Sequence, residues 1–170
     1  MDTNFIVIFS YFIVIYRIIQ LHEVLIAMDF QNQFTITTTD ANLMETVQHG
    51  SSEYPFRYYY ENIALFDFKC IDWHWHSELE FIYIESGNVV FDIGAVHFEL
   101  NEGNGIMINS KILHRLQSSG DAIIPNFLFQ PSFIAPQDSL IYKKYINPVI
   151  SSSLEYLVFQ PDIPWQKKSS

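Results

Sequence analysis

The side chains best suited to chemistry in this chain lie close together near its middle. Residues 72–80 read DWHWHSELE, and a further histidine, His114, follows downstream. In a β-strand, residues two apart share a face, so His74, His76 and Glu80 can point in one direction. Imidazoles and a carboxylate are suitable ligands for a first-row divalent metal, and with His114 the set suits zinc, iron, manganese or nickel.

The same four side chains also have an interpretation without metal chemistry. They could form a hydrogen-bonded polar layer inside the fold. Metal binding needs neutral imidazole, so any affinity should fall as the pH drops through the histidine range near about 6.5. Both interpretations stay open, and a divalent transition metal is a candidate cofactor rather than an assigned one.

Five neighbouring side chains are candidates for contact with a small ligand. Trp73 and Trp75 could stack on a flat ligand face, but they alternate with the histidines, which favours packing on the opposite face of the strand. Tyr58 and Tyr60 share one face of their own expected strand and could line a pocket. Glu78 is either a rim residue or a hydrogen-bond acceptor for the ligand, and the sequence does not choose between these roles.

The other histidines and the cysteine suggest no second site. His22, His49 and His97 have no partners close in sequence and are expected to be surface or packing residues. Cys70 lies beside Ile71 in an apolar run, which favours a buried small hydrophobe over a redox thiol. A single cysteine permits no internal disulfide. No G-x-S-x-G segment, phosphate-binding glycine loop or Cys-x-x-Cys pair occurs, which argues against nucleophilic catalysis.

A series of short strands is expected to hold these residues. Apolar and aromatic runs recur about every ten residues, and turns at Gly87, Gly94 and Gly103 separate some of them. Many short strands of this kind predict a sandwich or barrel. Prolines interrupt the chain after residue 130, where a short helix is expected at 139–146 and a helical turn or late strand at 151–158. The expected strands are 56–60, 63–70, 78–85, 88–93, 96–100, 105–108, 113–117 and 123–129.

The composition fits one acidic domain with a substantial core. The 170 residues are 49% hydrophobic and 16% aromatic, and they carry a formal charge of -10 at pH 7. A DNA-binding domain needs a basic surface to meet phosphates. The nine Lys and Arg residues are scattered and form no basic helix, so these residues are not expected to touch nucleic acid themselves.

The spacing of the potential metal ligands resembles the motifs of the cupin superfamily. The first motif, His-x-His followed by Glu and a later Gly, matches residues 74–87. The second motif, which ends in His, matches Gly103 and His114. The four ligand positions agree, but flanking positions depart from the pattern. The family's leading Gly falls at Phe68, its Pro at Asn109, its second-motif Gly at Lys111 and its final Asn at Ser118.

Further segments agree in order and spacing with one group of cupins. They are WHWHSELEFIYIESG at 73–87, FQPSFIA at 129–135, SLIYKKYINPVI at 139–150 and PWQKK at 164–168. Over about residues 45–168 the chain is similar to the N-terminal cupin of AraC-type bacterial transcription regulators. The resemblance implies an all-β fold, the cupin double-stranded β-helix or jelly roll, with a short helical C-terminal tail.

The resemblance also implies a function. In such regulators the barrel binds a small effector, often a sugar, helices after the barrel build a homodimer, and a C-terminal pair of helix-turn-helix motifs binds DNA. We therefore expect a cytoplasmic effector-sensing domain that is not an enzyme and that meets DNA only through a domain absent from these residues. One alternative is a metal-dependent cupin enzyme, such as a small dioxygenase or isomerase. Another is a stand-alone partner that forms mixed dimers with full-length regulators.

Four regions are expected along the chain. An apolar leader at 1–28 precedes a polar arm at 29–53, which is the expected moving part. The cupin barrel occupies 54–130. A tail at 131–170 leads toward the absent dimerisation and DNA-binding helices.

The leader allows three interpretations. Its uninterrupted apolar stretch runs only from Phe5 to Tyr16, short of the roughly 20 residues that a membrane-spanning helix needs. It also lacks the flanks of a signal peptide. A membrane anchor, a buried or partner-seeking segment, and an upstream extension of a protein that starts at Met28 stay open. The change in sequence character at Met28 favours the last, so a membrane partner is not expected.

Overall fold

The structure is a computed structural model, and it describes residues 36–160. The expected leader at 1–28 and the first residues of the expected arm lie outside the described residues, as do residues 161–170. Within residues 36–160, no helix is long and apolar enough to cross a membrane. What is expected of the leader therefore stays a prediction.

Short strands make up most of the described chain, as the sequence predicts. Those at 88–93, 105–108 and 123–129 have the expected bounds. The late segment near 151–158 forms a strand rather than a helical turn. The strands of residues 36–160 are β1 (Phe56–Asn62), β2 (Cys70–His74), β3 (Leu79–Tyr83), β4 (Asn88–Ile93), β5 (Val96–Asn101), β6 (Gly105–Ile108), β7 (His114–Gln117), β8 (Ile123–Phe129) and β9 (Tyr156–Phe159).

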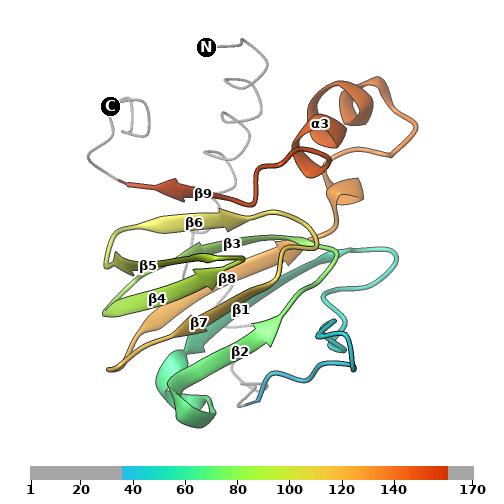
Figure 1. The fold of residues 1–170 in the computed structure, drawn as a ribbon. Helices are drawn as coiled ribbons and strands as arrows, with labels where there is room; N and C mark the ends of the chain where they lie inside the picture. The colour runs from blue at the N-terminus through green and yellow to red at the C-terminus, as the bar shows by residue number, and fades with distance from the viewer. Residues whose placement is uncertain (1–35, 161–170) are drawn as a thin grey trace.

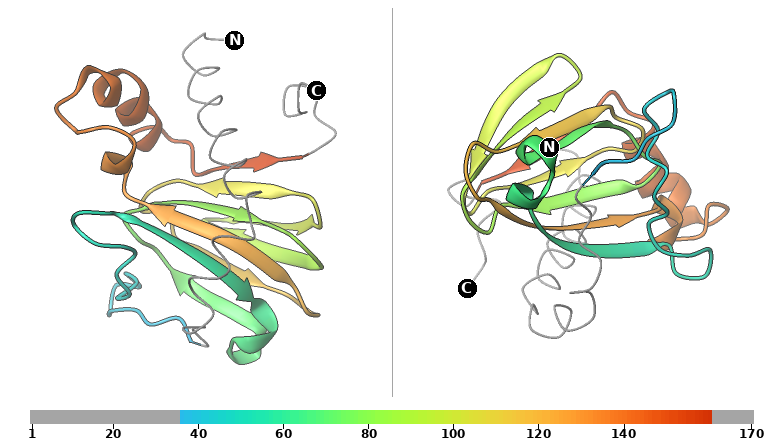
Figure 2. Two further views of the ribbon diagram at one scale, coloured as in Figure 1. Left: turned by 180° about the vertical axis from the view of Figure 1, so that it is seen from behind. Right: turned by 90° about the horizontal axis from the view of Figure 1, so that it is seen from below.

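The strands form two antiparallel sheets that face each other (Figures 1 and 2). A five-stranded sheet has the order β1-β8-β3-β6-β9, and a four-stranded sheet has the order β2-β7-β4-β5. From β2 to β8 the chain crosses repeatedly between the sheets and returns to pair antiparallel within each. This arrangement is typical of a jelly roll, so the predicted all-β cupin fold is confirmed.

Side-chain alternation divides the apolar residues of the strands between two cores. In β3, Ile82 belongs to a core between the sheets, whereas Leu79 and Phe81 belong to a core on the outer face of the five-stranded sheet. The inner core also holds Phe91, and the outer core holds Phe127. Phe81 and Phe127 stack with their ring centroids 5.0 Å apart, an arrangement worth about 1 kcal/mol beyond the buried area.

The segment after β8 covers the outer core. Ile134, Ile150 and Leu154 pack against the outer-core residues. Between them the chain forms a π-helix, η4 (Tyr142–Ile146), which continues into the short helix α3 (Asn147–Ile150). The predicted short helical tail is therefore present, and its apolar side chains help to bury one face of the sheet.

The expected strand at 63–70 is wrong. Residues there form two 3-10 turns, η1 (Ile63–Leu65) and η2 (Asp67–Lys69). The Asn62 side chain accepts a hydrogen bond from the amide of Ala64 and so starts the first turn. Phe68 then has a φ of 58° and is 98% exposed. An apolar run therefore does not form a strand here, because its local hydrogen bonds and its backbone turn favour a corner.

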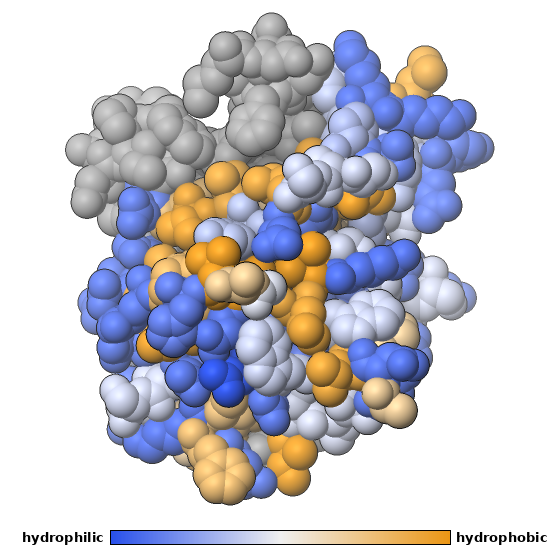
Figure 3. Space-filling model, viewed as in Figure 1, coloured by the Kyte–Doolittle hydropathy of each residue, from blue (hydrophilic) through white to orange (hydrophobic). Residues whose placement is uncertain are grey.

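Apolar side chains reach the surface at this corner. Leu65 and Phe68 are both exposed. In Figure 3 most of the visible face carries hydrophilic side chains, with an apolar band higher up and a separate apolar group at its lower end, where η1 and η2 lie in Figure 1.

The two positions at which the sequence lacks a cupin-motif glycine keep a glycine-like backbone. Phe68 and Lys111 have φ values of 58° and 65°. The glycines that match the motifs, Gly87 and Gly103, have φ values of 83° and 85°. A non-glycine residue in the left-handed region costs about 1–2 kcal/mol, so the turns persist at these positions at some expense in stability.

Gly87 and Gly103 provide a matched pair for testing the turns. A Cβ at Gly87 would lie 2.4 Å from the backbone oxygen of Asp121, whereas at Gly103 it would meet nothing within 4 Å. We expect Gly103→Ala to lower the free energy of unfolding by about 1–2 kcal/mol, and Gly87→Ala to lower it substantially more. Urea unfolding of both variants measures the difference. Equal losses would contradict the close approach at Gly87.

Candidate ligand cavity and metal centre

Three histidines and one glutamate converge inside the barrel. His74 ends β2 and pairs with His114 at the start of β7, while Glu80 lies in β3. One ligand atom from each of His74, His76, Glu80 and His114 lies within 4.8 Å of the others. All four residues are buried, with exposed fractions from 0% to 6%. The structure therefore brings together the four residues that the sequence predicts as a set, while metal binding itself stays a prediction.

Backbone carbonyl groups orient the imidazoles. The Nδ1 atoms of His74 and His114 lie 2.7 and 2.8 Å from the carbonyl oxygens of Asp72 and Ile112. His76 makes a longer contact of the same kind, 3.3 Å, to a backbone oxygen. A carbonyl oxygen only accepts, so each Nδ1 is the atom that donates. This leaves the Nε2 atoms facing the centre of the cluster, as in histidines that bind metals.

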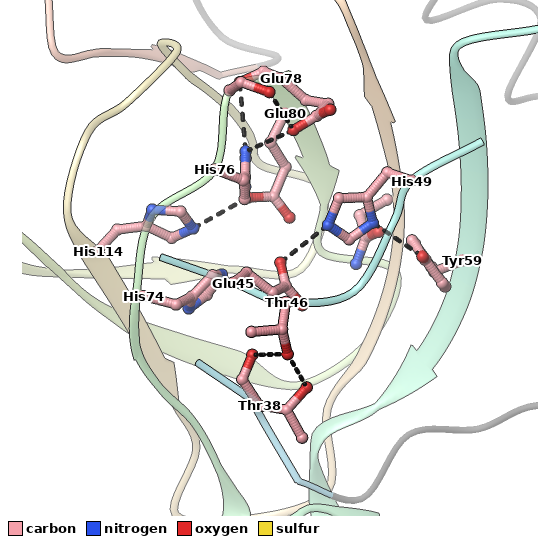
Figure 4. A network of polar contacts seen from close by, with 12 residues as sticks. Thr38, Glu45, Thr46, His49, Tyr59, His74, His76, Glu78, Glu80 and His114 are labelled. Atoms are coloured by element: carbon pink, nitrogen blue, oxygen red, sulfur yellow. Dashed lines mark hydrogen bonds and ion pairs between the residues drawn. The ribbon is translucent and has the colours of Figure 1, made fainter. Parts of the chain in front are cut away.

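The centre of the cluster favours a cation. The Nε2 atoms of His114 and His76 lie 3.1 and 3.3 Å from Oε2 of Glu80 (Figure 4). When Nδ1 carries the proton of a neutral ring, Nε2 has none to donate. The Nε2 atom of His114 is in fact buried without a hydrogen-bond partner. Lone pairs facing a carboxylate are unfavourable unless a proton or a metal ion lies between them, so the donor set fits a divalent metal.

The ionisation of the cluster agrees with this arrangement. Burial, followed by the nearby His114, lowers the pKa of His74 to about 3, which keeps its imidazole neutral. Burial alone would raise the pKa of Glu80, but the adjacent imidazoles of His114 and His76 outweigh it and hold this pKa well below its usual range. A neutral imidazole beside an ionised carboxylate is the state in which these groups bind a metal.

A cavity of about 40 Å³ adjoins the cluster. His74 and Glu80 line it on one side, and residues from the polar arm line it on another, among them Glu45, Val47 and His49. One water molecule needs about 10–15 Å³, so the cavity admits a group of a few atoms. The arm therefore forms a wall of the cavity rather than a separate extension.

Hydrogen bonds to the histidine segment hold the arm in place. The backbone amides of Glu45 and Trp75 donate to the carbonyl oxygens of Trp75 and Leu43, at 2.9 and 3.0 Å. The indole nitrogen of Trp75 donates to the carbonyl oxygen of Asn42, at 2.9 Å. The backbone amide of Asp72 donates to the Thr37 hydroxyl, at 3.0 Å. The segment that supplies His74 and His76 is therefore also the support of the arm.

A second polar group lies in the cavity next to the metal ligands, with the ring centroids of His49 and His76 5.6 Å apart. The two ring nitrogens of His49 lie 2.9 Å from the Tyr59 hydroxyl and 2.9 Å from Oε2 of Glu45 (Figure 4). Burial opposes ionisation of both His49 and Glu45, but their mutual hydrogen bond outweighs it, so the pKa of His49 is raised and that of Glu45 is lowered. The sequence predicts His49 to be a surface or packing residue. The surface position is wrong, because His49 is buried.

A third polar pair completes the cavity. The Asn126 side-chain amide donates to Oε2 of Glu61 at 2.6 Å. Burial raises the pKa of Glu61 to about 8, and the like charges of Glu80 and Glu45 act in the same direction. Asn126 is 2% exposed, and its Oδ1 atom has no hydrogen-bond partner.

The structure places the predicted ligand-contact residues mainly elsewhere. Tyr58 and Tyr60 do not line this cavity but belong to the outer core, and their expected contact with a ligand stays a prediction. Tyr59 lies in the cavity wall instead, because the phase of alternation in β1 is opposite to the expected one. The expectation that Trp73 and Trp75 point away from the histidines holds. Trp73 lies under the Arg115 guanidinium and Trp75 holds the arm.

Glu78 is neither on the rim nor in this cavity. It is 7% exposed, and its Oε2 accepts a hydrogen bond from the Ser77 hydroxyl. The same oxygen lies 3.9 Å from Nδ1 of His76. Its position supports the His76 ring, while the expected contact with an effector stays a prediction.

Sequence reasoning missed Glu45, His49, Tyr59, Glu61 and Asn126. A strict alternation in the strand at 56–62 would have paired Tyr59 with Glu61 as readily as Tyr58 with Tyr60. The only available signal was the cost of burying the charged Glu61. That signal favoured the arrangement in which Tyr58 and Tyr60 face inward. No local pattern connects His49 with this strand, because the arm reaches it only through the fold.

The raised pKa of Glu61 predicts a pH-dependent stability. In the unfolded chain this carboxyl ionises near 4.5, and in the fold near 8. The free energy of unfolding should therefore fall as the pH rises from about 4.5 to about 8, by at most about 1.4 kcal/mol per pH unit. Glu61→Gln removes this term and keeps a carbonyl acceptor for Asn126. We expect Glu61→Gln to gain stability over the wild-type chain as the pH rises through that range. The difference in the free energy of unfolding should then level off.

Urea unfolding at several pH values measures this effect. Glu102→Gln, at an exposed turn, serves as the control and should follow the wild-type curve. A constant difference between Glu61→Gln and the wild-type chain from pH 5 to 8 would contradict the shifted pKa.

Part of the chain matches a known family of domains. Residues 66–135 match the family model described as AraC-like ligand binding domain. The chain is 31% identical over 131 residues to the HTH-type transcriptional regulator YdeC of Bacillus subtilis, a match that covers 75% of this chain and 44% of the regulator. The chain thus spans less than half of this relative.

Solved structures also match parts of the barrel. A cupin-2 domain protein from Shewanella frigidimarina is 13% identical, with a TM-score of 0.39, over 45% of this chain and 72% of that chain. A variant of oxalate decarboxylase from Bacillus subtilis is 21% identical, with a TM-score of 0.35, over 38% of this chain and 19% of that chain. The family match and the regulator, together with the two-sheet barrel, identify residues 66–135 as an AraC-like ligand-binding domain of the cupin type.

Proposed function

We propose that this domain binds a small effector in the cavity beneath the arm and that the protein carrying it uses this binding to regulate transcription. The observation that carries the proposal is a buried polar cavity with one wall made by the arm and the others by the barrel. The related regulator is of the HTH type, so we propose that DNA is bound by a helix-turn-helix part and not by the acidic barrel. A cytoplasmic homodimer without enzymatic activity is part of this proposal.

The same proposal assigns a role to each region of the chain. The arm at 29–53 closes the cavity, the barrel at 54–130 supplies the ligands, and the tail at 131–170 connects the barrel to the dimerisation and DNA-binding helices. An effector changes the output only if it binds one arrangement of arm and barrel more tightly than another. Glu45 and His49 of the arm line the cavity. An effector that contacts them therefore binds more tightly when the arm lies over the cavity.

Filling the cavity tests the proposed site. Val47→Phe enlarges an arm side chain that lines the cavity and leaves the strands unchanged. We expect small polar compounds from a fragment panel to raise the melting temperature of the purified chain by several degrees, and we expect Val47→Phe to lose this increase. A thermal-shift assay with both proteins measures it. An increase that persists in Val47→Phe would place binding outside the cavity, and no increase with any compound would also count against the proposal.

We further propose that His74, His76, Glu80 and His114 hold one divalent transition metal, with zinc, iron, manganese and nickel as candidates. The converging Nε2 atoms and the unpartnered Nε2 of His114 support this assignment. A bound ion would supply a Lewis-acidic position for an oxygen of a ligand at the cavity edge. The three imidazoles and the carboxylate hold that position, and the backbone carbonyls fix the rings.

Metal titration separates this proposal from a metal-free polar layer. We expect the purified chain to bind one Zn²⁺ ion, and His114→Ala to weaken the binding by about tenfold or more. His97→Ala is the control, because His97 is an exposed residue that pairs with Asp92. Isothermal titration calorimetry measures both affinities. Equal affinity in the wild-type chain and His114→Ala would exclude the cluster as the metal site.

A further inference from the structure

The cavity wall is rich in hydrogen-bond acceptors. Carboxyl groups of Glu45, Glu61 and Glu80 line the cavity, and so does the Asn126 side chain. None of the described residues that line it is a lysine or arginine. The wall therefore offers negative charge and acceptor oxygens to whatever enters it.

Two of the three carboxyl groups have basic partners in the fold. Glu80 is contacted by His76 and His114, and Glu45 by His49. The side-chain hydrogen bond of Glu61 comes from the neutral amide of Asn126, and no cationic side chain within residues 36–160 forms an ion pair with it. Glu61 is half-buried, and because a carboxylate that is partly removed from water is unfavourable without a cationic partner, it is a position at which a bound cation would be stabilising.

Asn126 points to a donor at the same place. Its amide nitrogen is already used by Glu61, but its Oδ1 atom has no partner and is buried. A buried amide oxygen left without a donor is unfavourable. A ligand group that donates to Oδ1 and also carries positive charge would satisfy Asn126 and Glu61 together.

A single metal ion does not fit this second position. Among residues 36–160, Glu45 and Glu61 do not belong to the group whose ligand atoms lie within 4.8 Å of one another. These carboxyl oxygens are therefore not gathered around one point as the four ligands of the metal centre are. An organic group with several N–H donors can reach separated acceptors, whereas a hydroxyl group has only one proton to donate.

We propose that the effector is a small organic cation whose primary ammonium group binds between the Glu61 carboxylate and the Asn126 Oδ1 atom. This inference rests on the proposed function and specifies its ligand class. The ammonium group donates one hydrogen bond to each acceptor, and its positive charge favours the ionised form of Glu61. The small volume of the cavity limits the part of the effector that lies beneath the arm to a few atoms.

Matched pairs of amines and alcohols test the ligand class. The probes are 2-aminoethanol against ethylene glycol and 1,3-diaminopropane against 1,3-propanediol, at equal concentration and ionic strength. We expect the amine of each pair to raise the melting temperature of the full chain at pH 7.5, and the diol to have no comparable effect. Glu61→Gln keeps the acceptor for Asn126 but loses the charge, so we expect it to abolish the effect of the amines. Glu102→Gln, the exposed control, should keep it.

Several outcomes would overturn this inference. Diols that stabilise the chain as strongly as amines would contradict the need for a cation. Amines that act equally on Glu61→Gln would place the cation elsewhere, and amines that have no effect would also reject the ligand class. These outcomes leave the proposed function standing if other compounds lose their effect in Val47→Phe, so the two failures are distinguishable. Retained urea-unfolding cooperativity of Glu61→Gln excludes misfolding as the cause of a loss.

Discussion

Ionisable side chains buried inside the barrel must find partners, and this requirement shapes the rest of the structure. The effective penalty for removing a single ion from water is several kcal/mol in a folded protein. Glu80 is compensated by imidazoles from two other segments, and Glu45 by His49. Most of these contacts join different elements, so the polar interior is stable only when the arm, the histidine segment and the sheets are assembled together.

The same interior limits how much apolar surface the barrel can bury between its sheets. The fold compensates with the second core on the outer face of the five-stranded sheet, where Phe81 and Phe127 stack beneath the tail. In β8, Asn126 and Leu128 line the cavity while Phe127 and Phe129 face the outer core. One strand thus contacts both the ligand cavity and the segment that leaves the barrel. A displacement of β8 by a ligand would be felt directly by the packing of the tail.

The arm and the metal centre share a support in the same way. Trp75 lies between His74 and His76 in the sequence, and its backbone and indole hold the arm. Because the side chains of a strand alternate, one short segment can present imidazoles inward and a tryptophan outward. The support of the arm and two of the cluster's imidazoles therefore lie on neighbouring residues.

The sequence by itself determined the strand series, the four converging ligands and the outward position of the tryptophans. These features depend on local spacing, alternation and turn residues, which a single sequence contains. The turn at Phe68 is an exception, because the apolar run around it predicted a strand and the chain forms a corner there.

Only the tertiary structure decided which face of β1 looks inward and what the arm contacts. The three consecutive tyrosines did not indicate which of them face the interior. The pairing of Tyr59 with Asn126 in β8 decided it. His49, Glu61 and Asn126 come from an arm and two strands separated by up to 77 positions. Their meeting in one cavity depends on how the strands pair and where the arm lies, and no local property of the chain specifies either.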